Sequence, residues 1–398
     1  MEIKPAHRVQ SARPPATPDL AARAIELARS GRDIIDFSGT GSDLSPPPEI
    51  LAAARAALDA APDTSGGGAG AAALQTAIVA KFERDNDLRF GPEQVVVTHG
   101  ARHALYILMQ TLLNEDDEVV VPAPYWPGYP ELARLAGADP VIVRTRARHR
   151  FRMTPEELRG ALGRRTRLVI LNNPCNPSGV VYGRGELEAL ARVLVEFPEV
   201  VVVCDEVYEY QCRSREPFAT LLNVAPRLHE RTVIVNGLTK TWGMDDWRVG
   251  YAAGPARLIG AMQRVQALST AAPGAVVQAA AVAALAAPRE LLAERNAALE
   301  RRHAHLHAAL SAIDGIDVQA GEGGHHLLPH VGRVIDRLAE VDDDFDLAAR
   351  LLEQAGVLTL PGSACGMPGY LRLGYALDDA RLVEGTRRLA SVLGGPSS

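Results

Sequence analysis

The strongest constraint on this chain is a regular alternation of short β-branched runs with longer helical segments. Three of the runs cover residues 94–98, 118–122 and 200–204, and segments with helical periodicity lie between them. Alternating strands and helices are typical of βαβ units, whose parallel strands are buried on both faces. The sequence therefore predicts an α/β fold, with a large domain in which a mainly parallel sheet lies between helices.

The alternation ends near residue 288, where the sequence predicts a smaller α+β domain. Its expected elements are a charged helix over 290–311, helices over 345–354 and 379–393, and strands near 357–360 and 371–375. We expect a large domain over residues 47–287 and a small domain over 288–398, which the N-terminal segment 1–46 joins.

Charge and composition exclude several classes of protein. The net charge of −6 and the isoelectric point of about 6.0 give no basic surface for nucleic acid or for an anionic membrane. The 4 cysteines form no C-x-x-C pair, and no metal site is expected. The N-terminus lacks the pattern of a signal peptide, and the alanine-rich stretch at 274–287 is too short for a membrane span. We expect a cytoplasmic enzyme or binding protein without a disulfide scaffold.

Chemically useful residues follow the predicted strands at the sheet edge where open α/β folds bind ligands. They include a glycine at a helix start, aromatic rings, an amide, a carboxylate, a lysine and two arginines. These residues are Gly100, Ala101, Arg102, Trp126, Asn176, Asp205, Tyr208, Thr239, Lys240 and Arg248. Backbone N–H groups at a helix start bind phosphate, and a lysine can form a Schiff base. Together they fit pyridoxal 5′-phosphate (PLP), a phosphorylated and protonatable aromatic ring.

The motifs that contain these residues resemble those of the fold-type I PLP-dependent enzymes. Asn-Pro-x-Asn-Pro-x-Gly occupies 173–179, Asp-Glu-x-Tyr occupies 205–208, and Lys240 stands eight residues before Arg248. With Leu-Arg-Leu at 371–373, this order is similar to the class I/II aminotransferases, in the branch of the bacterial aspartate aminotransferases. The resemblance implies an enzyme that acts on an α-amino acid through an external aldimine and a quinonoid, most simply an aminotransferase.

The same resemblance implies a role for each cofactor-binding residue. Lys240 would bind PLP covalently and then move the substrate proton, while Asp205 would keep the ring nitrogen protonated. Asn176 and Tyr208 would bond the ring oxygen O3′, and Trp126 would stack on the ring. The phosphate would be held by Arg248, with help from Thr239, and by the backbone N–H groups of Gly100, Ala101 and Arg102.

The substrate side is implied in the same way. Arg372 would clamp the α-carboxylate of the amino acid with its planar guanidinium. Further substrate contacts are expected from Gly39, Ser65, Trp126, Asn176 and His326. A 2-oxo acid would be the second substrate, and the protein would be a homodimer with shared active sites.

Three departures from the family pattern leave the substrate open. Ser65, followed by three glycines, stands where the family usually has a tyrosine that reaches the phosphate from the partner subunit, which favours a wider entrance for a bulky substrate. Asp245 and Asp246 replace the usual Thr-Gly, and a carboxylate there would orient Arg248 or face a cationic substrate. Arg102 replaces a lysine that binds a distal carboxylate in the bacterial aspartate enzymes, so it permits an acidic substrate.

Other readings of the sequence compete with transamination. Gly39-Thr40-Gly41 resembles the start of a dinucleotide-binding motif, but Leu44 occupies the place of its third glycine. A non-catalytic PLP-binding protein would have no need of an intact Lys240. Within the fold, the same residues would serve β-elimination, C–S lysis, decarboxylation or cyclisation, as in enzymes of secondary metabolism.

Overall fold

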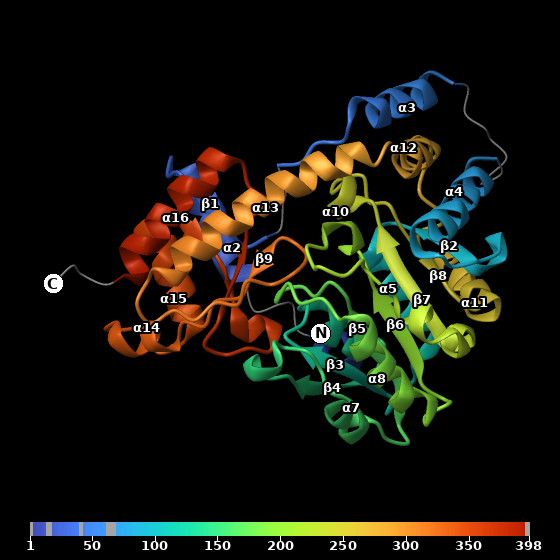
Figure 1. Ribbon diagram of the computed structural model, residues 1–398, viewed down its shortest axis with the longest axis horizontal. Helices are drawn as coiled ribbons and strands as arrows, with labels where there is room; N and C mark the ends of the chain where they lie inside the picture. Colours follow the sequence, from blue (N-terminus) through green and yellow to red (C-terminus); the bar gives the residue numbers. More distant parts are fainter. Residues whose placement is uncertain (1–2, 13–17, 40–42, 61–68, 395–398) are drawn as a thin grey trace.

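The computed structural model describes residues 3–12, 18–39, 43–60 and 69–394. Its main feature is a seven-stranded sheet of order β2-β8-β7-β6-β5-β3-β4, in which β8 runs opposite to the other six strands. The strands are β2 (Val95–Thr98), β3 (Glu118–Ala123), β4 (Asp139–Arg144), β5 (Thr166–Asn172), β6 (Val201–Asp205), β7 (Thr232–Gly237) and β8 (Gly250–Ala253). The predicted α/β fold with a mainly parallel sheet is confirmed (Figure 1).

Helices cover both faces of this sheet. They are α3 (Pro48–Asp59), α4 (Ala69–Asn86), α5 (Ala101–Leu112), α6 (Gly128–Leu135), α7 (Pro155–Ala161), α8 (Arg184–Val195), α9 (Leu221–Val224), α10 (Thr239–Trp242), α11 (Ala256–Ala267) and α12 (Ala275–Ala286). Successive strand residues point to opposite faces, so Val202 belongs to the core with α8 and Val203 to the core with α5 and α11. Burial on both faces explains why the sequence shows continuous β-branched runs rather than alternation.

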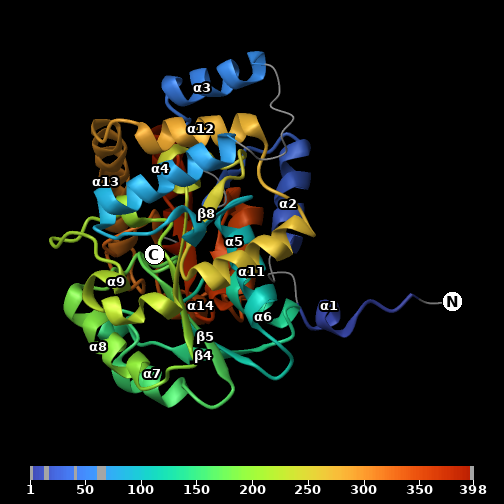
Figure 2. The same ribbon diagram turned by 90° about the vertical axis from the view of Figure 1, so that its right-hand side faces the viewer.

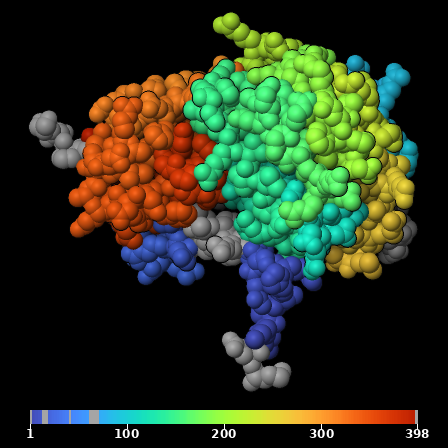
Figure 3. Space-filling view, turned by 90° about the horizontal axis from the view of Figure 1, so that it is seen from below, coloured from blue at the N-terminus to red at the C-terminus, as the bar shows by residue number. Residues whose placement is uncertain are grey.

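A further hydrophobic core lies beside the sheet and is built from both ends of the chain. Ile35 and Phe37 pack there with Leu299, Tyr375 and Leu389. The elements are α2 (Pro18–Arg29), β1 (Ile35–Asp36), α13 (Glu290–Ser311), β9 (His326–Leu327), α14 (Gly332–Arg337), α15 (Asp344–Arg350), β10 (Val357–Leu358), β11 (Leu360–Pro361), β12 (Leu371–Gly374) and α16 (Asp379–Leu393). In the space-filling view the C-terminal residues form one lobe and the sheet region another (Figure 3).

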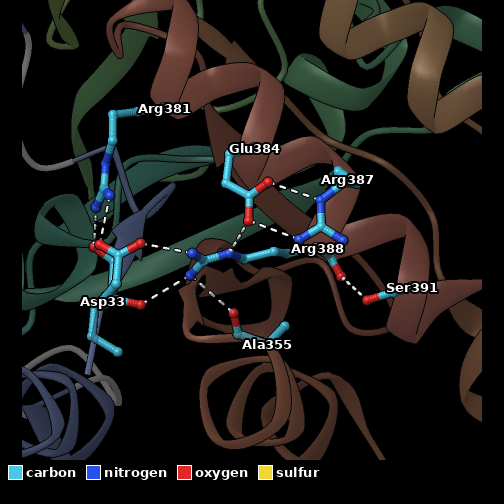
Figure 4. Close-up of polar contacts among 8 residues, drawn as sticks. Asp33, Ala355, Arg381, Glu384, Arg387, Arg388 and Ser391 are labelled. Atoms are coloured by element: carbon cyan, nitrogen blue, oxygen red, sulfur yellow. Dashed lines mark hydrogen bonds and ion pairs between the residues drawn. The ribbon is translucent and has the colours of Figure 1, made fainter.

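The N-terminal segment is tied to the C-terminal lobe by pairing and by charge. Strand β1 pairs in parallel with β10, Ile35 opposite Val357. Asp33 binds Arg381 at 2.6 Å and Arg388 at 2.7 Å, and Glu384 binds Arg388 in turn (Figure 4). Because these ion pairs are partly exposed, they orient the N-terminal segment on the C-terminal lobe but contribute little to the stability of the fold. The domain boundaries near residues 46 and 287 stay a prediction.

Some elements differ from the sequence prediction. The strand expected over 357–360 is two short strands, and the helix expected over 345–354 ends at Arg350 and continues as a π-type turn over Leu351–Ala355. Strand β8 and helix α11 were not predicted. For β8 the reason is that Gly250-Tyr-Ala-Ala has no β-branched residue.

Two regions stand away from the centre of the molecule. Helix α1 (His7–Ser11) lies near α6, and the chain before it extends outward (Figure 2). Helices α3, α12 and α4 lie side by side at the far edge. Among the described helices none is alone long and apolar enough to cross a membrane, although α12 and α13, bent by 86° at their junction, meet that test as a pair.

Candidate active site

A cavity of about 240 Å³ opens at the carboxyl ends of β5, β6 and β7. Nearly all of the residues predicted from the sequence meet on its walls. These are Gly39, Ala101, Arg102, Trp126, Asn176, Asp205, Tyr208, Thr239, Lys240, Arg248 and Arg372. Gly100 lies directly behind Arg248, and Ser65 falls outside the described residues. The topology thus gathers residues that are far apart in the chain at the edge where α/β sheets bind ligands.

One end of the cavity is shaped for an anion. Helix α5 begins after Gly100, which has no side chain to cap the N–H groups of the first turn. Gly100 has φ of +83°, and a Cβ there would lie 2.6 Å from Nη2 of Arg248. A Cβ on Gly250 would lie 2.5 Å from the backbone nitrogen of Ala101. Glycines therefore let a helix N-terminus and an arginine approach each other, as a phosphate site requires.

The cavity also holds a buried carboxylate with which no described cation pairs. Asp205 ends β6 and is 6% exposed. It accepts hydrogen bonds from the Tyr129 hydroxyl at 2.6 Å and from the Val207 backbone at 3.4 Å, and no described cation pairs with it. Burial raises the pKa of Asp205 to about 6, against the hydrogen bonds that lower it. A protonated ring nitrogen would supply the positive charge that this site lacks, so the residues fit the cofactor.

Tyr129 is a site residue that the sequence reasoning missed. Its side chain is 1% exposed, lies at the start of α6 and donates to Asp205. Burial first, and then the Asp205 charge, raise the pKa of Tyr129, which keeps it a donor. The only signal in the sequence was its position three residues after Trp126, one helical turn along.

The substrate wall is formed by Arg372 from β12. Its guanidinium donates to Oδ1 of Asn176 at 3.2 Å and to the backbone oxygen of Ser38. The side chain is 5% exposed, and its Nε has no hydrogen-bond partner in the structure. A buried N–H without a partner favours an incoming acceptor, because leaving it unsatisfied is unfavourable. A carboxylate provides that acceptor with the right charge.

Lys240 is placed in the cavity by β7 and by the short helix α10 that follows it. Its Nζ lies 3.0 Å from Oδ1 of Asp245, and its backbone oxygen accepts a hydrogen bond from Gln211 at 2.7 Å. The other lysines of the sequence are Lys4 and Lys81. Lys4 is exposed near the N-terminus, and Lys81 is fully buried in an ion pair with Glu209. Lys240 is therefore the lysine whose amine a cofactor in this cavity can reach.

Arg102 and Trp126 form the outer wall. The guanidinium carbon of Arg102 lies 5.1 Å from the centre of the Trp126 ring, a cation–π contact. No described carboxylate pairs with Arg102. Partial burial, and then the nearby charge of Arg248, lower the pKa of Arg102 without removing its charge at neutral pH. The cavity thus has cationic groups at Arg102 and at Arg372.

His326 lies beside the cavity, and its contact with substrate stays a prediction. Its side chain is 2% exposed and packs against Tyr208 and beside Gly39, so it is not on the wall of the described cavity. His325 lies against the same tyrosine, and neither of its ring nitrogens has a hydrogen-bond partner. Burial lowers the pKa of both histidines well below the usual range, which keeps them neutral.

No group of His, Cys, Asp and Glu in the described ranges is arranged for a metal ion.

The fold and the cavity define a class: PLP-binding α/β enzymes with a lysine, a buried aspartate and a buried arginine on one cavity. The sequence matches the family "Aminotransferase class I and II" over residues 33–389, and the chain belongs to that family. The protein is a PLP-dependent aminotransferase, with an amino acid and a 2-oxo acid as its substrate classes. The elimination, decarboxylation and cyclisation left open by the sequence have no better support.

Individual relatives agree with this assignment. The chain is 35% identical to an aspartate/prephenate aminotransferase of Nitrosomonas europaea, over 98% of this chain and 100% of the relative. It is 36% identical to an aspartate aminotransferase of Bacillus subtilis, over 97% and 98%. Among solved structures, the aspartate aminotransferase of Rhizobium meliloti has a TM-score of 0.91 at 34% identity, covering 98% and 99%. That of Thermus thermophilus with maleate has a TM-score of 0.89 at 35% identity, covering 98% and 100%.

Proposed function

We propose that the protein transfers the amino group of a dicarboxylic amino acid, of which aspartate is the simplest, to a 2-oxo acid. The observation that carries the proposal is the pair of arginines on one cavity: Arg372, whose Nε has no partner, and Arg102, with which no carboxylate of the described residues pairs. Two carboxylates on one substrate would each meet a guanidinium. The names of the relatives, and the dicarboxylate maleate bound by one of them, support the same class.

The proposed roles of the other residues follow from their places in the cavity. PLP, when bound, withdraws electrons from the substrate's Cα and so makes its proton removable. Lys240 binds the cofactor and later takes and returns the Cα proton. Asp205, fixed by Tyr129, holds the ring nitrogen in its protonated form. Asn176 and Tyr208 contact the ring edge, and Trp126 covers its face.

In this proposal, separate groups of residues bind the phosphate of the cofactor and the α-carboxylate of the substrate. Arg248, Thr239 and the backbone N–H groups of Gly100, Ala101 and Arg102 hold the phosphate. Arg372 orients the α-carboxylate, with Gly39 allowing close approach of the backbone. Ser65 is proposed as a further substrate contact, and so is His326, which packs against Tyr208 and beside Gly39.

Replacement of Arg102 by glutamine tests the substrate class. We expect kcat/KM for aspartate to fall about 10- to 100-fold, because a charged hydrogen bond to the side-chain carboxylate is lost. The value for alanine should change little. Initial rates with the two amino acids and one 2-oxo acid provide the measurement. Arg257→Gln, an exposed arginine on α11, is the control. An equal loss with both amino acids would contradict the proposal.

A homodimer is part of the proposal. Helix α12 contains no charged residue, and Ala275, Ala279, Ala283 and Ala286 on its outer side are exposed or partly exposed. A row of small apolar residues permits close packing, and a second copy of this chain provides a matching surface. Together with α3 and α4, this edge is the proposed contact.

The dimer is tested by Ala283→Glu. A buried charge at a close-packed contact should dissociate the dimer and lower activity at least about tenfold, because each site is expected to need both subunits. Light scattering gives the mass and an activity assay gives the loss. Ala380→Glu, on an exposed position of α16, should change neither. Full activity of a wild-type monomer in dilute solution would rule the dimer out.

The cysteines support a reducing compartment, which we propose to be the cytoplasm. Cys175, Cys204, Cys212 and Cys365 are all free thiols. Burial raises the pKa of Cys175, Cys204 and Cys365, so these thiols stay protonated and unreactive. Such cysteines fit a compartment in which disulfides do not form.

A further inference from the structure

The cavity contains a second carboxylate that the proposed chemistry does not use. Asp245 lies on the wall beside Lys240, with its Oδ1 3.0 Å from Nζ of the lysine. The two side chains are 27% and 17% exposed, respectively. Asp205, the other carboxylate of the cavity, accepts a hydrogen bond from Tyr129 and pairs with no described cation. Among the described residues, Asp245 is the only carboxylate that holds the Lys240 amino group.

The turn after α10 fixes this carboxylate in place. Gly243 has φ of +68°, in the left-handed region, and reverses the chain so that residue 245 returns beside residue 240. A Cβ on Gly243 would collide with the backbone of Leu44, so the turn is closely packed. The backbone oxygen of Asp245 accepts a hydrogen bond from Nη1 of Arg248 at 3.1 Å. Asp245 is thus held at its main chain while its side chain points to the lysine.

The neighbouring Asp246 provides a contrast. It is exposed, it is not on the cavity wall, and the structure gives it no ion pair. The contact with Lys240 is therefore a property of position 245 rather than of a diffuse acidic surface.

We propose that Asp245 is a positioning residue that holds the amino group of Lys240 whenever that group is not bonded to the cofactor. This inference rests on the proposed role of Lys240. There are two such occasions: before the cofactor is captured, and after the substrate's amine has displaced the lysine. On the second occasion Lys240 has to carry the Cα proton, and an amine on a flexible four-carbon chain does so efficiently only when it is held in place.

Loss of Asp245 is expected to change the rates of these two steps in opposite directions, speeding cofactor capture and slowing proton transfer. During capture, the neutral amine of Lys240 bonds to the aldehyde carbon, and its two protons leave with the aldehyde oxygen as water. The ion pair with Asp245 opposes this step, so its removal should speed capture. During proton transfer the neutral amine takes the Cα proton while a hydrogen bond to Asp245 places it. The carboxylate then stabilises the positive charge that develops on the nitrogen, so its removal should slow this step. A general distortion of the site would slow both.

Asp245→Asn keeps the shape of the side chain and removes its charge. Mixing the cofactor-free enzyme with pyridoxal phosphate and following the visible band of the lysine-bound cofactor gives the capture rate. We expect it to rise about two- to fivefold, the range for partly exposed ion pairs. Single-turnover mixing of the loaded enzyme with aspartate gives the proton-transfer rate. We expect a fall of about tenfold, a larger isotope effect with Cα-deuterated aspartate, and an unchanged substrate dissociation constant.

Matched variants separate the outcomes. Asp246→Asn should behave as wild type in both measurements, and Asp245→Glu should recover part of the proton-transfer rate. Faster capture together with slower proton transfer supports the proposal, and any other combination overturns it. If the wild type gives no visible band, or Lys240→Ala still gives one, the proposed role of Lys240 fails instead.

Discussion

Replacement of Lys240 by alanine is expected to reduce transamination by about 10⁴-fold or more. The variant loses both the covalent attachment of the cofactor and the base that moves the Cα proton, and each contributes strongly to the rate. Steady-state rates with aspartate and a 2-oxo acid measure the loss. The visible band of the lysine-bound cofactor should disappear at the same time.

The lysine content of the chain makes this prediction unusually easy to check. Lys4 is exposed, and Lys81 is buried against Glu209. Reduction with borohydride should therefore attach the cofactor to the peptide that contains Lys240 and to no other. Lys4→Ala serves as the control and should keep full activity. Attachment at Lys81, or substantial turnover by Lys240→Ala, would contradict the assignment.

Asp205→Asn is expected to have two large effects of opposite sign. Activity should fall about 10²- to 10³-fold, because the protonated ring nitrogen loses its charged partner. The cofactor-free protein, by contrast, should be more stable at pH 7. The pKa of Asp205 is raised from 3.8 to about 6 by burial, which corresponds to about 3 kcal/mol of destabilisation once the carboxylate is ionised.

The sign of the pH dependence follows from this shift. In the unfolded chain the carboxyl ionises above pH 3.8, and in the folded cofactor-free protein above about pH 6. The destabilisation is therefore absent below about pH 4, grows up to about pH 6 and stays constant above it. Urea unfolding of wild type and variant should give equal stabilities near pH 4 and a more stable variant at pH 7. A variant that is less stable than wild type at pH 7 would contradict the argument.

The cofactor-binding residues could be predicted from the sequence more completely than the other residues of the site. Asp205 ends β6 and Lys240 follows β7, and the ends of parallel strands meet at one edge, so the convergence of these two residues could be predicted. Arg248 precedes β8, and its spacing from Lys240 identified it. Tyr129 could not be predicted, because its contact with Asp205 joins residues 76 positions apart and leaves no local pattern.

The charge of the substrate was the property that the sequence predicted least well. Arg102 and Asp245 suggested opposite charges when only their positions were known. The structure separates them, because Asp245 is paired with Lys240 while Arg102 lies over Trp126 without a carboxylate partner. The difference depends on the turn at Gly243 and on the start of α5, whose geometry the residue types alone do not specify.

The pairing of β1 with β10 has a consequence for the order in which the site is assembled during synthesis. Ile35 leaves the ribosome early, but its partner Val357 is made only near the end of translation. Residues 95–253, which supply the sheet and most of the cofactor-binding groups, are complete before that. Domains tend to fold in the order in which they are made. The nascent chain is therefore expected to form its cofactor-binding half first, and to gain the substrate-binding half, with Gly39 and Arg372, only when its last hundred or so residues emerge.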